Sequence, residues 1–425
     1  MEIILNPKPQ ELAPLTRRNI PADDAAVAIQ VERIVKTVQS NGDEALRRFA
    51  IEFDGTQLTS FEVSEEEIAE GCSKVKPEVA EAIEKAADHI SKFHAAQKPH
   101  EVEVQTVNGV RCLQRPVAIN RVGLYIPGGR APLFSTVLML AIPAHIAGCK
   151  EVVMFTPKSK GNPIAPEILY AARTAGVDKI YAIGGAQAIA AMAYGTESIA
   201  RVDKIFGPGN RYVTKAKQMV SAVTAIDMPA GPSEVMIMAD RSAMPEFVAA
   251  DMLSQAEHGP DSQAIAVVDS KELANRISEE VERQANLLKR KDSVEGSLAH
   301  SRIVVFNSRE EMTSFANLYG PEHLIISMEE PWEIAGEITA AGSVFIGNYS
   351  PESAGDYASG TNHTLPTGGW ARSLSGVNLD SFLHKITYQE ITPEGLAELA
   401  PTIVAMANAE GLDAHAQAVN VRTAK

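Results

Sequence analysis

Short apolar runs separated by helical segments dominate the chain from about residue 120 to residue 233. Most of these runs are rich in β-branched residues, and they stand at 122–126, 151–155, 179–183, 202–205 and 223–226. Strands of a parallel sheet carry continuous apolar runs of this kind, because helices cover both faces of the sheet. The pattern therefore predicts a mostly parallel α/β unit.

The same pattern restarts at Glu234. Further strand-like runs, again alternating with helical segments, stand at 234–239, 263–269, 302–306, 323–327 and 343–346. We therefore expect an α/β fold with two successive, incomplete Rossmann-like doubly wound units, divided near Gly231-Pro232.

The flanking segments have other textures. Residues 1–21 contain several prolines and predict an irregular N-terminal arm, and residues 24–100 show the apolar stripes of amphipathic helices. Residues 348–378 are rich in Gly, Ser, Thr and Asn and predict a long functional loop, and a helical tail is expected at 393–417. From these textures, and from the family resemblance described below, we expect residues 22–119 and 234–377 to form one domain, 120–233 a second domain, and 378–425 a C-terminal tail.

Composition narrows the class of protein. A chain of 425 residues with a net charge of −15 suits a soluble enzyme of small metabolites and argues against general affinity for nucleic acid or acidic lipid. Its three cysteines are far apart and do not predict a disulfide framework. No segment has the length of an apolar membrane span, and the first residues do not resemble a signal peptide. We expect a cytoplasmic location.

A candidate metal site stands where a helix beginning near Ala243 ends at Gly259-Pro260. Gln255 and His258 are three residues apart, so a carboxamide oxygen and an imidazole share one helix face. Asp356 and His415 are candidates for the other ligands of a zinc ion, which takes nitrogen and oxygen donors. A hydrogen-bonded surface pair has the same spacing, so the spacing leaves both interpretations open.

Three glycine-rich turns follow strands of the first unit, at 127–130, 184–187 and 207–210. Glycine allows backbone N–H groups to approach a phosphate, so the turns favour a nucleotide site, although tight strand-to-helix turns need glycine anyway. Glu322 and His323 precede a strand and form a candidate acid–base pair, or else only a polar turn. His363 lies in the polar loop and is either functional or simply solvated.

Together these motifs resemble the histidinol dehydrogenase family over essentially the whole chain. The motifs that carry the resemblance are 125–129, 183–188, 206–210, 230–234, 255–259, 320–323 and 360–366. The resemblance implies oxidation of L-histidinol through L-histidinal to L-histidine with two NAD, the last step of histidine biosynthesis. It also implies one zinc ion per subunit and an intertwined homodimer.

The resemblance further implies a role for each site residue. Gln255, His258 and Asp356 would bind zinc, with His415 of the partner subunit as fourth ligand. Glu322 and His323 would be the acid–base pair. The remaining roles are substrate binding by Ser233, His363 and Glu410, and NAD binding by Tyr125, Gln187 and Asn210.

Other functions are kept open. A relative on the same scaffold could oxidise a different small alcohol, such as a sulfonated diol. A zinc hydrolase would use Glu322 to activate water without a nucleotide, and a metabolite-binding protein would have no turnover at all.

Overall fold

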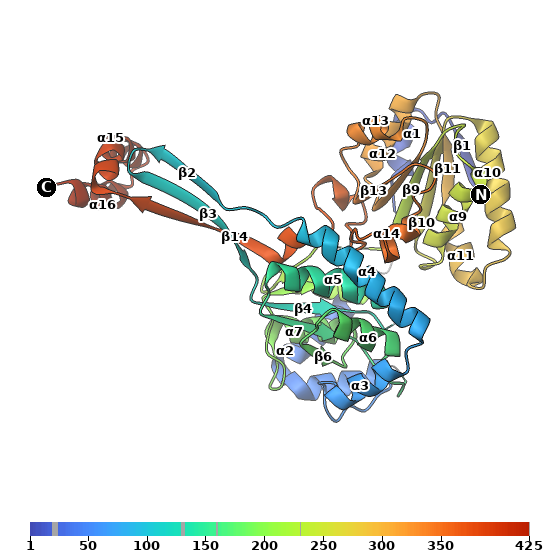
Figure 1. Cartoon of the computed structure of the whole chain (residues 1–425), viewed down its shortest axis with the longest axis horizontal. Helices are drawn as coiled ribbons and strands as arrows, with labels where there is room; N and C mark the ends of the chain where they lie inside the picture. Colours follow the sequence, from blue (N-terminus) through green and yellow to red (C-terminus); the bar gives the residue numbers. More distant parts are fainter. Residues whose placement is uncertain (19–23, 129–131, 159, 230, 425) are drawn as a thin grey trace.

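The structure is a computed structural model that describes residues 1–18, 24–128, 132–158, 160–229 and 231–424. Two α/β units lie side by side, and a long arm extends away from them to the C-terminus (Figure 1). Within the described residues, no helix is both long and apolar enough to span a membrane.

The first unit contains a five-stranded parallel sheet. Its strands stand in the order β6-β5-β4-β7-β8, so the strand that comes first in the sequence is central. The strands are β4 (Arg121–Tyr125), β5 (Glu151–Phe155), β6 (Lys179–Tyr181), β7 (Lys204–Phe206) and β8 (Ala225–Ile226). The connecting helices are α5 (Phe134–Ala147), α6 (Pro166–Thr174), α7 (Gly185–Tyr194) and α8 (Arg211–Val220). This is the doubly wound order without its sixth strand.

The second unit repeats the same winding in a six-stranded parallel sheet, in the order β1-β11-β10-β9-β12-β13. Its strands are β1 (Glu2–Leu5), β9 (Glu234–Ala239), β10 (Gln263–Val268), β11 (Arg302–Val305), β12 (His323–Ser327) and β13 (Ser343–Ile346). Its helices are α9 (Pro245–Ala256), α10 (Lys271–Ala285), α11 (Lys291–Leu298), α12 (Arg309–Tyr319) and α13 (Pro331–Glu337). The α/β fold with two parallel sheets predicted from the apolar runs is confirmed.

The N-terminal segment corrects one expectation. Residues expected to be an irregular arm form β1, which pairs in parallel with β11 at the sheet edge, and α1 (Pro9–Leu15). Leu15 is buried in the core on one face of the six-stranded sheet. The short apolar run at Ile3 and Ile4 is enough for an edge strand, whereas the prolines around it suggested irregular chain. Residues 19–21 of the expected arm lie outside the described part.

Three N-terminal helices pack on the five-stranded sheet. They are α2 (Asp24–Asp54), α3 (Glu65–Ser73) and α4 (Pro77–Ala95). Their buried residues share one core with that sheet, for example Phe49 and Ile90 with Leu124. The sequence-based division grouped residues 22–119 with the other unit, and the packing here differs from it. An apolar stripe predicts that a helix face is buried, but not which sheet buries it.

The arm is built from two distant parts of the chain. Strands β2 (Val102–Val107), β3 (Val110–Ala118) and β14 (Leu383–Ile391) form an antiparallel sheet in the order β14-β3-β2. At its far end α15 (Pro393–Ala409) packs against α16 (Asp413–Thr423) (Figure 1). The expected helical tail therefore consists of two helices preceded by the strand β14, and residues 102–118 belong with it.

The polar segment at 348–378 is not a continuous loop. It contains the short helix α14 (Glu352–Tyr357) and the 3-10 turn η1 (Trp370–Arg372). A second 3-10 turn, η2 (Leu379–Phe382), leads into β14. Phe382 is fully buried and stacks on Phe206 with ring centroids 4.2 Å apart, which anchors the base of the arm to the five-stranded sheet.

Candidate functional site

The candidate acid–base pair lies at the amino ends of β9 and β12, the two neighbouring strands at which the winding of the six-stranded sheet reverses. His323 is the first residue of β12 and is in register with Val235 of β9. Glu322 directly precedes it, and the half-buried Ser233 directly precedes β9. Strand pairing therefore brings together residues that are far apart in the sequence.

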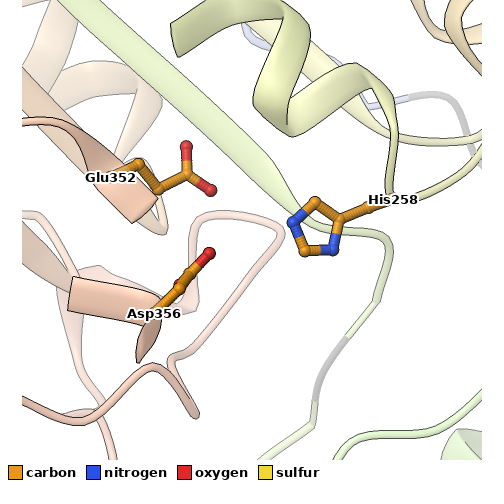
Figure 2. A group of neighbouring side chains, drawn as sticks. All are labelled: His258, Glu352 and Asp356. Atoms are coloured by element: carbon orange, nitrogen blue, oxygen red, sulfur yellow. The ribbon is translucent and has the colours of Figure 1, made fainter. Parts of the chain in front are cut away.

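Three ligand-type side chains converge beside this pair. One ligand atom from each of His258, Glu352 and Asp356 lies within 4.8 Å of the others. His258 follows the end of α9, and both carboxylates belong to α14. Glu352 and Asp356 are four residues apart, so they lie on one face of that helix. Figure 2 shows the imidazole pointing toward the two carboxylates.

The donor set fits a divalent metal ion. Imidazole and carboxylate groups are ordinary zinc ligands. Gln255 is fully buried on α9, and neither Oε1 nor Nε2 of its carboxamide has a hydrogen-bond partner among the described residues. The Oε2 atom of Glu352 is also buried and has no hydrogen-bond partner among the described residues. Buried polar atoms are nearly always paired, so these atoms are suited to a ligand that the protein itself does not supply.

The His323 imidazole is surrounded by carboxylates. Its Nδ1 lies 3.6 Å from Glu352 Oε1 and 3.7 Å from Glu322 Oε2. Its Nε2 lies 3.9 Å from Asp356 Oδ1. Burial lowers the pKa of His323 to about 3, so the ring is neutral at physiological pH and able to accept a proton.

The Glu322 carboxylate is held by a backbone group. Its Oε2 accepts a 2.8 Å hydrogen bond from the backbone N–H of Glu234. Burial raises the pKa of Glu322 well above its usual value. The hydrogen bond lowers this pKa, whereas the charges of Glu234 and Asp356 raise it further. Burial likewise raises the pKa of Asp356 to about 6, against the opposing effect of His258. A carboxylate with a raised pKa is a stronger base once it is ionised.

His363 connects the two α/β units. Its Nδ1 donates to the Asp356 carbonyl at 3.0 Å, so Nε2 is the acceptor for the hydroxyl of Thr136, 3.2 Å away on α5. Burial lowers the pKa of His363 to about 4. The ring is therefore neutral and fixed in one orientation beside the metal-type cluster.

The glycine turns lie at the carboxyl ends of the five-stranded sheet. Tyr125, buried at the end of β4, accepts a 3.0 Å hydrogen bond from Gly185 N through its hydroxyl oxygen. Gln187 is buried in the first turn of α7, with no partner for its Nε2 among the described residues. Asn210 is exposed and caps α8, accepting from the backbone N–H groups of Tyr212 and Val213. In the first turn, Gly129 and Arg130 lie outside the described residues.

Two predicted site residues are not brought to the cluster within one chain. Glu410 follows α15 and His415 belongs to α16, and both are exposed. These helices lie at the far end of the arm, away from both α/β units (Figure 1).

Comparison with known proteins matches this architecture over the whole chain. A family model described as histidinol dehydrogenase matches residues 17–423. Histidinol dehydrogenases of Bacteroides fragilis and Bacteroides thetaiotaomicron are similar to this chain. The first is 57% identical over 393 residues, 92% of each chain. The second is 51% identical over 424 residues, 99% of each chain. The crystal structure of histidinol dehydrogenase from Elizabethkingia anophelis superimposes with a TM-score of 0.95 at 48% identity, covering 99% of this chain and 98% of that one.

The chain belongs to the histidinol dehydrogenase family. It is thus an oxidoreductase, and the family resemblance inferred from the motifs is confirmed.

Sequence reasoning did not predict one member of the cluster, Glu352. It lies four residues before Asp356, a spacing that places two carboxylates on one face of a helix. That spacing was a usable signal, but the expected loop at 348–378 concealed it.

Proposed function

We propose that the chain oxidises L-histidinol to L-histidine through L-histidinal, with two NAD reduced in succession, as the last step of histidine biosynthesis. The observation that carries this proposal is the position of neutral His323 between Glu322, Glu352 and Asp356, beside the ligand-type His258. This arrangement combines a proton acceptor with a site that can hold a substrate rich in nitrogen atoms.

In the alcohol step, His323 takes the proton of the substrate hydroxyl group. Its low pKa keeps the ring unprotonated before the reaction, so that it can accept this proton. In the aldehyde step, Glu322 takes a proton from water to form the hydrated aldehyde. Its raised pKa strengthens it as a base for this task.

Gln255, His258 and Asp356 would hold a zinc ion, and Glu352 lies close enough to contribute a carboxylate. Such an ion would supply a Lewis acid that binds the imidazole and amine nitrogens of the substrate. Ser233 and His363 would contact the substrate beside it. Tyr125, Gln187 and Asn210 would contact NAD, which supplies the hydride acceptor.

We propose further that the active form is a homodimer with shared sites. The far end of the arm offers little core of its own, since the buried residues of α16 are Ala416 and Val419. Met406 and Val421 are 61% and 58% exposed there. A second copy of the chain would cover this surface, and its Glu410 and His415 would then reach the substrate and the zinc ion.

The test is an assay of the zinc-loaded protein with L-histidinol and NAD. We expect two NADH per substrate consumed, which the absorbance of NADH measures directly. A sulfonated diol and other small alcohols are assayed in parallel. Faster turnover of one of these would favour the alternative substrate, and turnover of an ester or amide without NAD would favour a hydrolase.

A further inference from the structure

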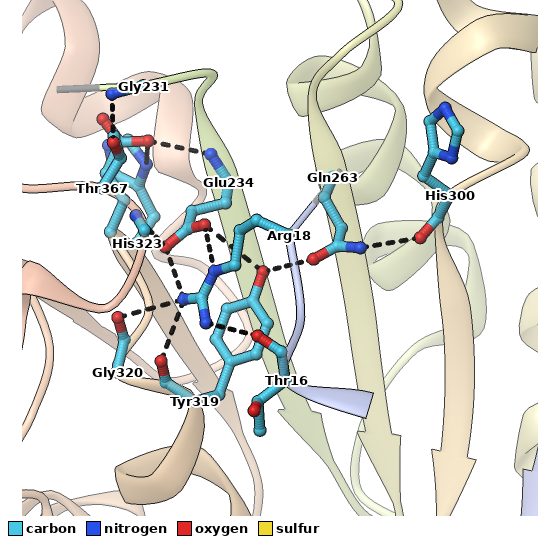
Figure 3. A network of polar contacts seen from close by, with 12 residues as sticks. Thr16, Arg18, Gly231, Glu234, Gln263, His300, Tyr319, Gly320, His323 and Thr367 are labelled. Carbon is cyan, nitrogen blue, oxygen red and sulfur yellow. Dashed lines mark hydrogen bonds and ion pairs between the residues drawn. The ribbon is translucent and has the colours of Figure 1, made fainter. Parts of the chain in front are cut away.

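A buried arginine from the N-terminal segment lies behind the acid–base pair. Arg18 forms a two-pronged ion pair with Glu234, through Nε to Oε2 and Nη2 to Oε1, both at 2.7 Å. Its side chain is 14% exposed and that of Glu234 is 1% exposed. Figure 3 shows this guanidinium between β9 and the turn that leads into β12.

The same guanidinium also binds the turn that carries Glu322. Its Nη2 donates to the Tyr319 carbonyl at 2.9 Å and to the Gly320 carbonyl at 3.4 Å. Its Cζ lies 3.5 Å from the centre of the Tyr319 ring. One planar group thus connects the first residue of β9 to the chain just before Glu322.

Glu234 passes this constraint to the active-site carboxylate. Its side chain is bound by Arg18 and also accepts from the backbone N–H of Gly368 at 3.2 Å. Its own backbone N–H donates to Glu322 Oε2 at 2.8 Å. A shift of the Glu234 backbone, which these side-chain bonds oppose, would therefore move the donor that orients Glu322.

We propose that Arg18 is a positioning residue for Glu322, acting through Glu234 and the Tyr319–Gly320 turn. The inference rests on the proposed function, because its effect is on the water-activating step assigned to Glu322. Lysine is not an equivalent residue here, since a single ammonium group cannot make two parallel bonds to the Glu234 carboxylate together with a bond to the Tyr319 carbonyl.

The test compares Arg18→Lys with Arg121→Lys as a matched control. The Arg121 side chain is also 14% exposed and pairs with Glu151, but it lies at the amino end of β4, opposite Tyr125. For Arg18→Lys we expect kcat for L-histidinal oxidation to fall about 10- to 100-fold with little change in KM. Oxidation of L-histidinol to L-histidinal should fall less. Arg121→Lys should keep both rates.

A double variant separates positioning from a general structural effect. If Arg18 acts through Glu322, then adding Arg18→Lys to Glu322→Gln should change aldehyde oxidation less than about twofold, because the two losses are not additive. Glu234→Gln, which keeps the backbone N–H but weakens the ion pair, should resemble Arg18→Lys. It provides a second folded protein for the same measurement.

Additive losses in the double variant, or unchanged aldehyde oxidation in folded Arg18→Lys or Glu234→Gln, would overturn the inference. These outcomes differ from failure of the proposed function. In that case the parent protein itself would not reduce NAD with L-histidinol or L-histidinal.

Discussion

The buried ion pair beneath the third glycine turn leads to a quantitative prediction. Lys217 on α8 pairs with Asp227, and their side chains are 4% and 2% exposed. Lys217 Nζ also donates to the Gly207 carbonyl at 2.8 Å, and Asp227 Oδ2 accepts from Gly207 N at 2.8 Å. Both backbone groups of Gly207 are thus held by this pair, and its φ of 119° is one that few other residues adopt.

Replacing Lys217 with Met keeps the length of the side chain but leaves the Asp227 carboxylate buried without its cation. Removing one partner of a buried pair typically costs about 3–5 kcal/mol. Asp227 keeps its hydrogen bonds from the N–H groups of Gly207 and Met228, so we expect roughly 3 kcal/mol, the lower end of that range. The KM for NAD should rise as well, because the turn at Gly207 loses one of its two anchors.

Urea unfolding followed by circular dichroism measures the loss of stability, and the double variant Lys217→Met/Asp227→Asn tests its cause. The double variant lacks both charges, so its loss of unfolding free energy should be smaller than the sum of the losses of the two single variants by at least about 2 kcal/mol. The exposed pair of Lys85 and Glu81 is the control, and Lys85→Met should leave the stability nearly unchanged, because an exposed ion pair contributes little. Additive losses in the double variant would refute the reasoning.

Two further predictions concern the shared site and its histidines. If His415 completes the site of a second copy, the inactive His258→Asn and His415→Asn proteins should regain activity when they are mixed and exchange subunits. Roughly a quarter of the parent activity is expected, because about half of the dimers are mixed and one of the two sites in each mixed dimer is intact. No recovery would contradict site sharing. The pKa of His363, lowered to about 4, lies below that of a histidine in the unfolded chain, so the unfolded chain binds the extra proton first and stability falls as the pH falls. Between about pH 6.5 and 4, the free energy of unfolding of the metal-free parent should therefore fall by up to about 3 kcal/mol more than that of His363→Gln. Acid-unfolding curves with the same pH dependence for the two proteins would contradict this prediction.

The apolar runs were sufficient to predict the central strands of the two sheets, such as β5 and β9, because these strands are buried on both faces. β5, β9, β12 and β13 have the bounds that the sequence predicted. The strands of the arm gave no comparable signal. β14 is exposed along nearly its whole length, so no buried face imposes an alternation of apolar and polar residues, and the same holds for most of β2.

The candidate site was predictable to a different extent for each residue. Glu322 and His323 are adjacent in the sequence, and Gln255 and His258 are one helical turn apart, so local spacing alone indicated both pairs. Joining them requires the pairing of β12 with β9 and the approach of α14 to α9. Contacts of this range depend on the assembled core, and no local pattern reports them.

The position of the proposed acid–base pair, Glu322 and His323, is one that the general rule for ligand sites in doubly wound sheets does not predict. Ligands of doubly wound sheets bind at the carboxyl ends of the strands, and the glycine turns of the first sheet follow this rule. Glu322 and His323 stand at the opposite, amino ends of the second sheet. The hydrogen bond between Thr136 of α5 and His363 shows how this edge meets the first unit. Two copies of one winding, placed with unlike edges together, can thus put the proposed NAD-binding edge beside the proposed catalytic edge, an arrangement that neither unit would reveal by itself.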